Sequence, residues 1–291
     1  MNIALFTDTY PPEINGVATS TANLQATLLA HGHNVLVVAT NPFTKTVTFE
    51  DGVVRVPGME LKQLYGYRAS NFYSDEAMKY VVAFAPDVIH CQTDVGIGIF
   101  GTIVAKRLHC GLIYTFHTMI EDYAYYVTHG HFDRFARHTV RWYFRQKSNL
   151  FTEFIAPSEK IKDYLRSIGI DKHVSVIPTG IDFSRFDKEK ENVGETKALK
   201  MKFGIDEDDF VILSLGRIAK EKSIDLVLRG YAKYLKGSPT KKTKFVITGL
   251  GPAEEELKEL AKTQEIEDGV WAKVKKASFN ALVWLFWAGV V

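Results

Sequence analysis

Short apolar runs alternate with stretches of helical periodicity along residues 1–180 of the chain. This alternation is typical of a parallel sheet in which crossover helices join consecutive strands. The pattern predicts strands at residues 3–6, 35–39, 53–56, 87–90, 112–116, 154–156 and 174–177, with 53–56 at an edge. It predicts helices at residues 17–31, 96–108, 132–147 and 158–168.

The alternation breaks at Pro178-Thr179-Gly180 and restarts with strands at 210–215 and 244–248 and helices at 223–235 and 252–263. The stretch between the two halves is charged and polar, which is typical of a linker. We therefore predict an α/β protein with two doubly wound domains: residues 1–180, a linker at 181–204, and a partial second domain at 205–291. Ligand is expected in a cleft at the carboxyl ends of the strands.

Composition narrows the class of protein but not its partners. Hydrophobic residues make up 46% and charged residues 24% of the chain, as in globular proteins that bury a core. Two cysteines provide no disulfide framework, and Cys91 is expected to be buried behind a strand. The N-terminus lacks the basic and apolar stretches of a signal peptide, and residues 281–291 are too few to span a bilayer. These features predict a cytoplasmic protein.

Glycines stand between a strand and a helix at two places where a phosphate could bind. Asn15 and Gly16 open the first predicted helix, while Gly249 and Gly251 follow the strand at 244–248. A helix N-terminus offers free N–H groups and a positive dipole end to an anion. A plain turn remains an equal alternative for Gly16.

The segment 96–101 matches the dinucleotide fingerprint, with glycines at 96, 98 and 101. It follows a later strand rather than the first, and no acidic residue stands about 20 positions further on. We favour the interpretation that these small residues let a helix pack closely against the sheet.

Two cations, Arg217 and Lys222, lie between the strand at 210–215 and the next helix. At the carboxyl end of a strand such cations can neutralise a diphosphate leaving group as its charge develops. The alternative is a solvated basic turn.

His117 ends the predicted strand 112–116, at the same sheet edge as Gly16, and Glu121 and Asp122 follow it closely. The acidic residues could bind hydroxyl groups or act as acid or base. A buried structural histidine and solvated loop carboxylates are the alternatives.

The predicted helix 132–147 combines cations with large aromatic residues. The cations proposed to contact a membrane, together with one aromatic residue, are Arg134, Arg137, Arg141, Trp142, Arg145 and Lys147. This combination suits an anionic membrane surface, where each Lys or Arg contributes about 1 kcal/mol. A solvated helix with its aromatic residues in the core is the alternative, while nucleic acid is disfavoured because no recognised binding motif accompanies the helix.

A series of short motifs follows one order along the chain: Thr7-Asp8-Thr9-Tyr10-Pro11-Pro12, Asn15-Gly16-Val17, Phe116-His117-Thr118, Ala156-Pro157-Ser158, residues 176–182, Gly216-Arg217 with Lys220 and Lys222, and residues 249–252. In order and spacing the series resembles the family 4 glycosyltransferases of the GT-B fold, over residues 1–268. Residues 117–123 resemble in particular the bacterial enzymes that glucosylate diacylglycerol from UDP-glucose.

The resemblance implies two Rossmann-like domains and a retaining, front-face transfer of a hexose, with glucose expected, from a UDP-sugar to a lipid hydroxyl such as that of diacylglycerol. It implies no metal ion and no cofactor. The basic helix would hold the protein peripherally at the inner face of the cell membrane.

The resemblance also assigns roles to individual residues. Asn15, Gly16, Gly249 and Gly251 would contact the donor phosphates. The catalytic group would comprise Arg217 and Lys222 at the leaving UDP, His117 at the transferred sugar and Asp122 near the acceptor.

Residues 269–291 depart from the family pattern, which continues with two glutamates eight positions apart and a final helix. The second domain is therefore expected to be truncated. An inactive fragment or nucleotide-binding module of the family is a second hypothesis, and a family 4 enzyme with a soluble acceptor is a third. An NAD-linked oxidoreductase, suggested by the glycines at 96–101, is disfavoured by the missing acidic partner.

Overall fold

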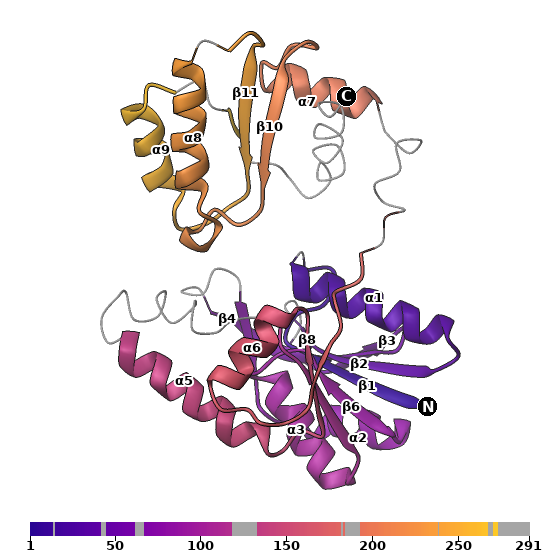
Figure 1. The fold of residues 1–291 in the computed structure, drawn as a ribbon. Helices are drawn as coiled ribbons and strands as arrows, with labels where there is room; N and C mark the ends of the chain where they lie inside the picture. The colour runs from indigo at the N-terminus through magenta and orange to yellow at the C-terminus, as the bar shows by residue number, and fades with distance from the viewer. Residues whose placement is uncertain are drawn as a thin grey trace. The chain divides into compact units, whose positions relative to one another are not determined.

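The computed structural model describes residues 1–13, 15–41, 45–61, 67–117, 133–181, 183, 193–237, 239–266 and 270–272. Within these ranges, the side chains of 60, 61, 67–69, 133–137, 140 and 270–272 are not described. The chain divides into two compact units, Met1–Ile181 and Asp182–Val291, and each is described by itself (Figure 1).

The first unit is built on a sheet that has nine strands among the described residues. The strands are β1 (Asn2–Thr7), β2 (Asn34–Asn41), β3 (Thr48–Glu50), β4 (Val53–Leu61), β5 (Tyr67–Ser70), β6 (Val88–Cys91), β7 (Gly111–Thr115), β8 (Glu153–Ala156) and β9 (Val174–Val176). Their order is β3-β4-β2-β1-β6-β7-β8-β9, and β5 pairs with β4. The pairing is parallel except where β3 and β5 meet β4. This is the predicted doubly wound arrangement.

Helices cover both faces of this sheet because successive strand residues point to opposite sides. Leu5, Val35 and Val37 form a cluster against which α1 (Gly16–Ala30) packs its partly buried Leu24 and Leu28. The other face carries a larger cluster that includes residues of α2 (Asp75–Phe84) and α3 (Ile97–Leu108). The remaining helices of the unit are α5 (Asp133–Ser148) and α6 (Glu159–Ser167), as Figure 1 shows.

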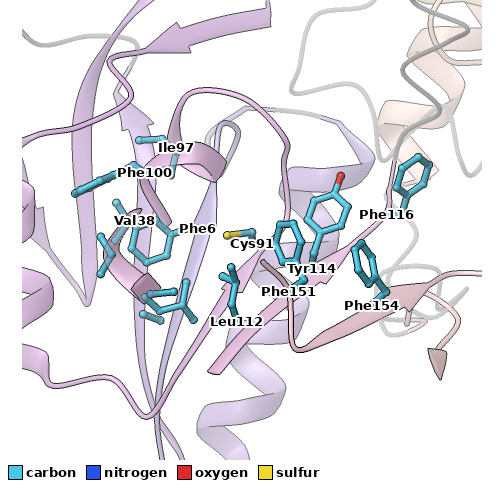
Figure 2. Close-up of a cluster of buried hydrophobic side chains, with 14 of the residues drawn as sticks. Phe6, Val38, Cys91, Ile97, Phe100, Leu112, Tyr114, Phe116, Phe151 and Phe154 are labelled. Atoms are coloured by element: carbon cyan, nitrogen blue, oxygen red, sulfur yellow. The ribbon is translucent and has the colours of Figure 1, made fainter. Parts of the chain in front are cut away.

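Aromatic side chains fill the larger cluster (Figure 2). The ring of Phe6 meets that of Phe100 edge to face, with 5.6 Å between ring centroids. Tyr114 contacts both Phe151 and Phe154, which connects the core beneath β7 to that beneath β8. Edge-to-face pairs contribute about 0.5–1.5 kcal/mol each beyond the area they bury, so this cluster adds to the stability of the first unit.

Glycines at 98 and 101 bring α3 close to the sheet. A Cβ at Gly98 would lie 1.9 Å from the Thr93 carbonyl oxygen, and one at Gly101 would lie 2.7 Å from Cys91 Sγ. This confirms that the segment 96–101 serves close packing of a helix, and Cys91 is buried as predicted.

The second unit contains a smaller parallel sheet in the order β10-β11-β12 among its described residues. Its strands are β10 (Phe210–Leu215), β11 (Thr243–Thr248) and β12 (Val270–Ala272). Its helices are α7 (Val193–Lys202), α8 (Ile224–Lys236) and α9 (Glu254–Thr263). The core is formed by apolar residues of α8, α9 and β11, including Leu228, Phe245 and Leu257.

The structure corrects two details of the predicted organisation. Strand β4 is not an edge strand, because it lies between β2 and β3 and also pairs with β5. Part of the predicted linker is the helix α7, in which Leu199 is buried. Its lysines, glutamate, alanine and leucine are good helix formers, so the polar composition that suggested a linker belongs to a solvated helix with a small buried side.

Candidate functional site

The carboxyl edge of the first sheet brings together three segments that are distant in the sequence. Strands β1, β6 and β7 are neighbours and run parallel, so their ends meet at one edge. Asp8 follows β1, Gln92 follows β6, and His117 stands two residues after β7. Gly16 opens α1 a few residues beyond Asp8.

His117 is held in one orientation by Gln92, with 2.7 Å between His117 Nε2 and Gln92 Oε1. Burial lowers the pKa of His117 to about 4, so the imidazole is neutral at physiological pH. With Gln92 Oε1 as acceptor, Nε2 carries the proton and Nδ1 is left as an acceptor. His117 can therefore accept a hydrogen bond from a hydroxyl group of a ligand.

Asp8 is a buried carboxyl group beside the first glycine loop. Its Oδ1 accepts a hydrogen bond from the Ile97 backbone N–H at 2.8 Å, and its own N–H donates to Thr93 Oγ1 at 2.9 Å. Burial raises its pKa to about 7, although the hydrogen bonds from Thr93 and Ile97 favour the charged form. Sequence reasoning placed Asp8 in a family motif without a role and did not single out Gln92, although both directly follow buried strands, where ligand-contacting residues of α/β sheets gather.

Asn15 and Gly16 form the N-terminus of α1 as expected. Asn15 is the N-cap: its Oδ1 accepts from the Ala18 N–H at 2.9 Å, and its Nδ2 donates to Thr9 Oγ1 at 2.6 Å. Gly16 is exposed, and a Cβ built on it would meet nothing within 4 Å. Among the described residues of this unit the space over Gly16 is open, so a ligand can approach this backbone closely.

In the second unit, the loops after β10 and β11 pack on each other. The Ile218 N–H donates to the Leu250 carbonyl at 3.1 Å, and the Gly216 N–H donates to the Thr248 carbonyl at 3.0 Å. A Cβ at Gly249 would lie 1.7 Å from the Gly216 carbonyl oxygen, and one at Gly251 would lie 2.1 Å from that of Ile218. Both glycines are thus required by contact between two backbones, whatever else they contact.

A short 3-10 turn, Lys220–Lys222, lies between β10 and α8; Arg217 precedes this turn and Lys222 is its last residue. The Arg217 side chain is 29% exposed and lies 4.0 Å from Glu221 Oε1. Lys222 is exposed. The turn therefore presents cationic side chains at the carboxyl end of β10, where an anionic leaving group can be neutralised.

Helix α5 carries the predicted membrane contacts on two different faces. Arg141 and Trp142 are exposed, and with His138 and Arg145 they line a cavity of about 230 Å³ against Ser167 and Ile168. Arg145 is also tied to α6, since its Nε and Nη2 donate to the Ile168 carbonyl at 3.1 and 2.9 Å.

Lys147 lies on the other face, and the prediction that it contacts a membrane is wrong. Lys147 is only 8% exposed, and its Nζ donates to the Asp94 carbonyl oxygen at 2.9 Å. The helical period carries position 147 onto the side of α5 that faces the sheet, along with the buried Phe144.

Other predicted site residues lie outside what the structure describes. Asp122 belongs to the stretch 118–132, and the side chains of Arg134 and Arg137 are likewise undescribed. In the described part of the chain, every helix is too short or too polar to cross a bilayer.

Comparison with solved structures defines the fold. Solved structures with the same fold include a glycosyltransferase from Rickettsia africae ESF-5 (TM-score 0.62, 14% identity, 97% of this chain and 69% of that one). Another is the catalytic domain of starch synthase IV from Arabidopsis thaliana, bound to ADP and acarbose (TM-score 0.61, 13% identity, 97% and 76%). The chain has a GT-B-like fold with an incomplete second domain.

The family follows from sequence comparison. Residues 14–185 match the model of "Glycosyltransferase Family 4", and residues 195–273 match that of "Glycosyl transferases group 1". The chain therefore belongs to glycosyltransferase family 4.

Two curated relatives are alpha-monoglucosyldiacylglycerol synthases. The one from Streptococcus pneumoniae R6 is 34% identical over 93% of this chain, and the one from Acholeplasma laidlawii is 34% identical over 87%. A GDP-mannose-dependent alpha-mannosyltransferase from Corynebacterium glutamicum is 25% identical over 89%. The chain spans about 60% of the length of the Streptococcus and Corynebacterium relatives and 64% of the Acholeplasma one.

Proposed function

We propose that this protein transfers glucose, with retention of configuration, from UDP-glucose to the hydroxyl group of a membrane lipid such as diacylglycerol. The observation that carries the proposal is the 34% identity to two alpha-monoglucosyldiacylglycerol synthases across most of this chain. The name of these relatives contains both the sugar, glucose, and the lipid, diacylglycerol. The exposed basic and aromatic face of α5 independently supports a lipid acceptor.

The proposed roles at the first sheet edge follow from the state of its side chains. Neutral His117 accepts a hydrogen bond from a hydroxyl of the transferred sugar at Nδ1 while Gln92 holds Nε2. The open backbone at Gly16, with Asn15 capping the helix behind it, receives a donor phosphate at the positive end of α1.

In the second unit, Arg217 and Lys222 are proposed to stabilise the leaving UDP. As the bond between sugar and phosphate breaks, negative charge builds on the diphosphate, and the two cations favour that charge. Gly249 and Gly251 let the loops after β10 and β11 lie together, which fixes the backbone that carries Arg217. Asp122 is proposed to lie near the acceptor hydroxyl.

The donor half of the proposal is tested by calorimetric titration of the protein with UDP, UDP-glucose and GDP-mannose. We expect UDP and UDP-glucose to bind and GDP-mannose to bind more weakly. Uridine is the control, because recognition of the diphosphate predicts that it binds far more weakly than UDP. Tighter binding of GDP-mannose would instead assign the chain to the mannosyl donors of the more distant relatives.

The lipid half is tested by cosedimentation with vesicles of phosphatidylcholine, with and without 30 mol% phosphatidylglycerol. Arg141→Gln is expected to weaken binding to the anionic vesicles about five-fold, since each cation near such a surface contributes about 1 kcal/mol. Arg229→Gln is the matched control, because it removes an exposed cation of α8 in the second unit. Equal binding of Arg141→Gln and the unmodified protein would contradict contact through α5, and equal binding to both vesicles would contradict an anionic surface.

A further inference from the structure

Lys147 is a buried cation for which the proposed function has no use. Its ammonium lies over the rings of Tyr143 and Phe151, with Nζ 5.4 and 5.8 Å from the ring centroids, and donates to the Asp94 carbonyl oxygen. Removal of an ammonium group from water costs several kcal/mol unless nearby groups compensate. A methionine or leucine would fill the same space without that cost, so the charge itself calls for an explanation.

The hydrogen bond from Lys147 goes to the loop after β6. Asp94 stands in this loop, and Tyr143 Oη also donates to its carbonyl oxygen, at 3.3 Å. Tyr114 Oη donates to the Asp94 carboxylate from β7. Two residues of α5 thus bind the backbone of Asp94, while Tyr114 of β7 binds its side chain.

The same loop contacts the site residues on its other side. Gln92 orients His117, and Thr93 Oγ1 accepts from the Asp8 N–H. The Ile97 N–H, at the start of α3, donates to the Asp8 carboxylate. The segment 92–97 therefore lies between Lys147 and both of the groups that we place at the sheet edge.

The positive charge of Lys147 also acts on the acidic groups around this loop. It lowers the pKa of the carboxyl groups of Asp8 and Asp94, which burial raises to about 7 and about 6. It also lowers the pKa of the Cys91 thiol, which burial raises to about 12. The other titratable groups around this cluster are Tyr114 and Tyr143, which hydrogen-bond to Asp94, and the neutral imidazoles of His90 and His117.

We propose that Lys147 is a positioning residue for glycosyl transfer: its ammonium fixes the segment 92–97, and through that segment it sets the orientation of His117 and the environment of Asp8. The inference rests on the proposed function in taking His117 as the contact to the transferred sugar. It assigns α5 two roles on two faces, with Arg141 and Trp142 outward and Lys147 inward.

The test uses the protein without donor or lipid. Carboxyl ¹³C NMR follows the titration of Asp8, and the imidazole signals of His117 report its orientation, each assigned with the corresponding Asn variant. Lys147→Met keeps the apolar stem but removes the charge and the donor. We expect it to raise the pKa of Asp8, because a nearby cation has been lost, and to shift the His117 signals, because the segment 92–97 has lost its contact with the ammonium group.

Two further variants separate positioning from mere packing. Lys147→Arg restores the charge and the hydrogen-bond donor. It is expected to bring the pKa of Asp8 and the His117 signals most of the way back to those of the unmodified protein. Tyr143→Phe removes one hydrogen bond to Asp94 and is expected to shift the His117 signals less, without moving the pKa of Asp8. Arg141→Gln, which removes an exposed cation of the same helix, is the control and is expected to change neither readout.

A folded Lys147→Met variant with the Asp8 titration and His117 signals of the unmodified protein would overturn the inference, even if it unfolds at a lower temperature. If Lys147→Met does not fold, unchanged His117 signals in Tyr143→Phe would overturn it. Neither readout involves UDP-glucose. Failure of the protein to bind donor would therefore contradict the proposed function, while the coupling between Lys147, Asp8 and His117 would still be tested by these NMR measurements.

Discussion

The two units each have a sheet edge with candidate site residues, and the two edges are built in different ways. At the edge of the first unit, buried polar groups hold one another: Gln92 fixes His117, and the segment 92–97 fixes Asp8. At the edge of the second unit, glycines bring two backbones together beside the partly exposed Arg217 and the exposed Lys222. The first edge is ordered by side-chain hydrogen bonds and the second by backbone contact.

This difference suggests that the two edges contribute to ligand binding in different ways. Buried hydrogen bonds set the protonation state and direction of a few groups, as selection among sugar hydroxyls requires. Cationic side chains in contact with solvent supply charge and several N–H donors, which suits a diphosphate with many acceptor oxygens. Substitutions should therefore affect stability, titration and ligand binding differently at the two edges.

The largest effect is expected for Gly249→Ala in the second unit. The added Cβ would lie 1.7 Å from a backbone oxygen, so the loops after β10 and β11 must separate. We expect a loss of at least about 4 kcal/mol in the free energy of unfolding of this unit, since neither backbone can give way locally. Urea unfolding followed by circular dichroism measures it. Gly230→Ala, at an open position of α8, is the control, and an equal effect in both variants would contradict the packing account.

An intermediate effect is expected for Asp8→Asn in the first unit, and it depends on pH. Burial raises the pKa of folded Asp8 to about 7, above the ordinary 3.8. A raised carboxyl pKa means that the folded state binds more protons, so the unmodified protein loses stability as pH rises from about 4 to 7. Asp8→Asn should lack that loss, which is on the order of 3 kcal/mol.

Thermal unfolding across this pH range, with the exposed Asp171→Asn as the matched control, measures the contribution of Asp8. Parallel pH profiles for Asp8→Asn and the unmodified protein would show that the carboxyl group is ionised in the fold already at low pH. His117 acts in the opposite direction, since its pKa is lowered to about 4 and its contribution is lost as pH falls from 6.5 toward 4. The difference between the two proteins removes this shared contribution.

The smallest effect on the fold, but a clear one on binding, is expected for Gly16→Ala. The new Cβ meets no atom within 4 Å in the described part of the chain, so the unfolding temperature should change by no more than about 2 °C. A donor phosphate against this backbone would meet the methyl group, and we expect the affinity for UDP-glucose to fall several-fold. Calorimetry and thermal unfolding on the same sample measure both. Unchanged affinity would remove Gly16 from the donor site.

Much of the first unit could be predicted because its strands are continuous apolar runs behind clear turns. Residues 3–6, 35–39 and 112–116 each coincide with an observed strand to within a few residues. Short or polar elements escaped prediction: α2, β3 and β5 had not been expected, and α7 was taken for linker. In these elements tertiary pairing or one buried face determines the structure, and neither leaves a long periodic pattern.

The candidate site was predictable where chain position alone determines it. His117 and Gly16 follow strands, so their common edge could be foreseen. Lys147 could not be placed correctly, because a cation on a basic helix reads as solvated unless the buried face of that helix is known. The supporting role of Gln92 was equally hidden, since it arises from contact between two loops 25 positions apart.

The burial of Cys91 beneath α3 has a practical consequence for labelling. Its thiol is enclosed and its pKa is raised to about 12, so it has almost no thiolate with which to react. The chain has one other cysteine, the half-buried Cys110, which immediately precedes β7 at the amino end of that strand. Burial raises the pKa of the Cys110 thiol as well, but its side chain is only partly enclosed. A maleimide dye or spin label is therefore expected to modify Cys110, at the end of β7 opposite His117, in preference to Cys91.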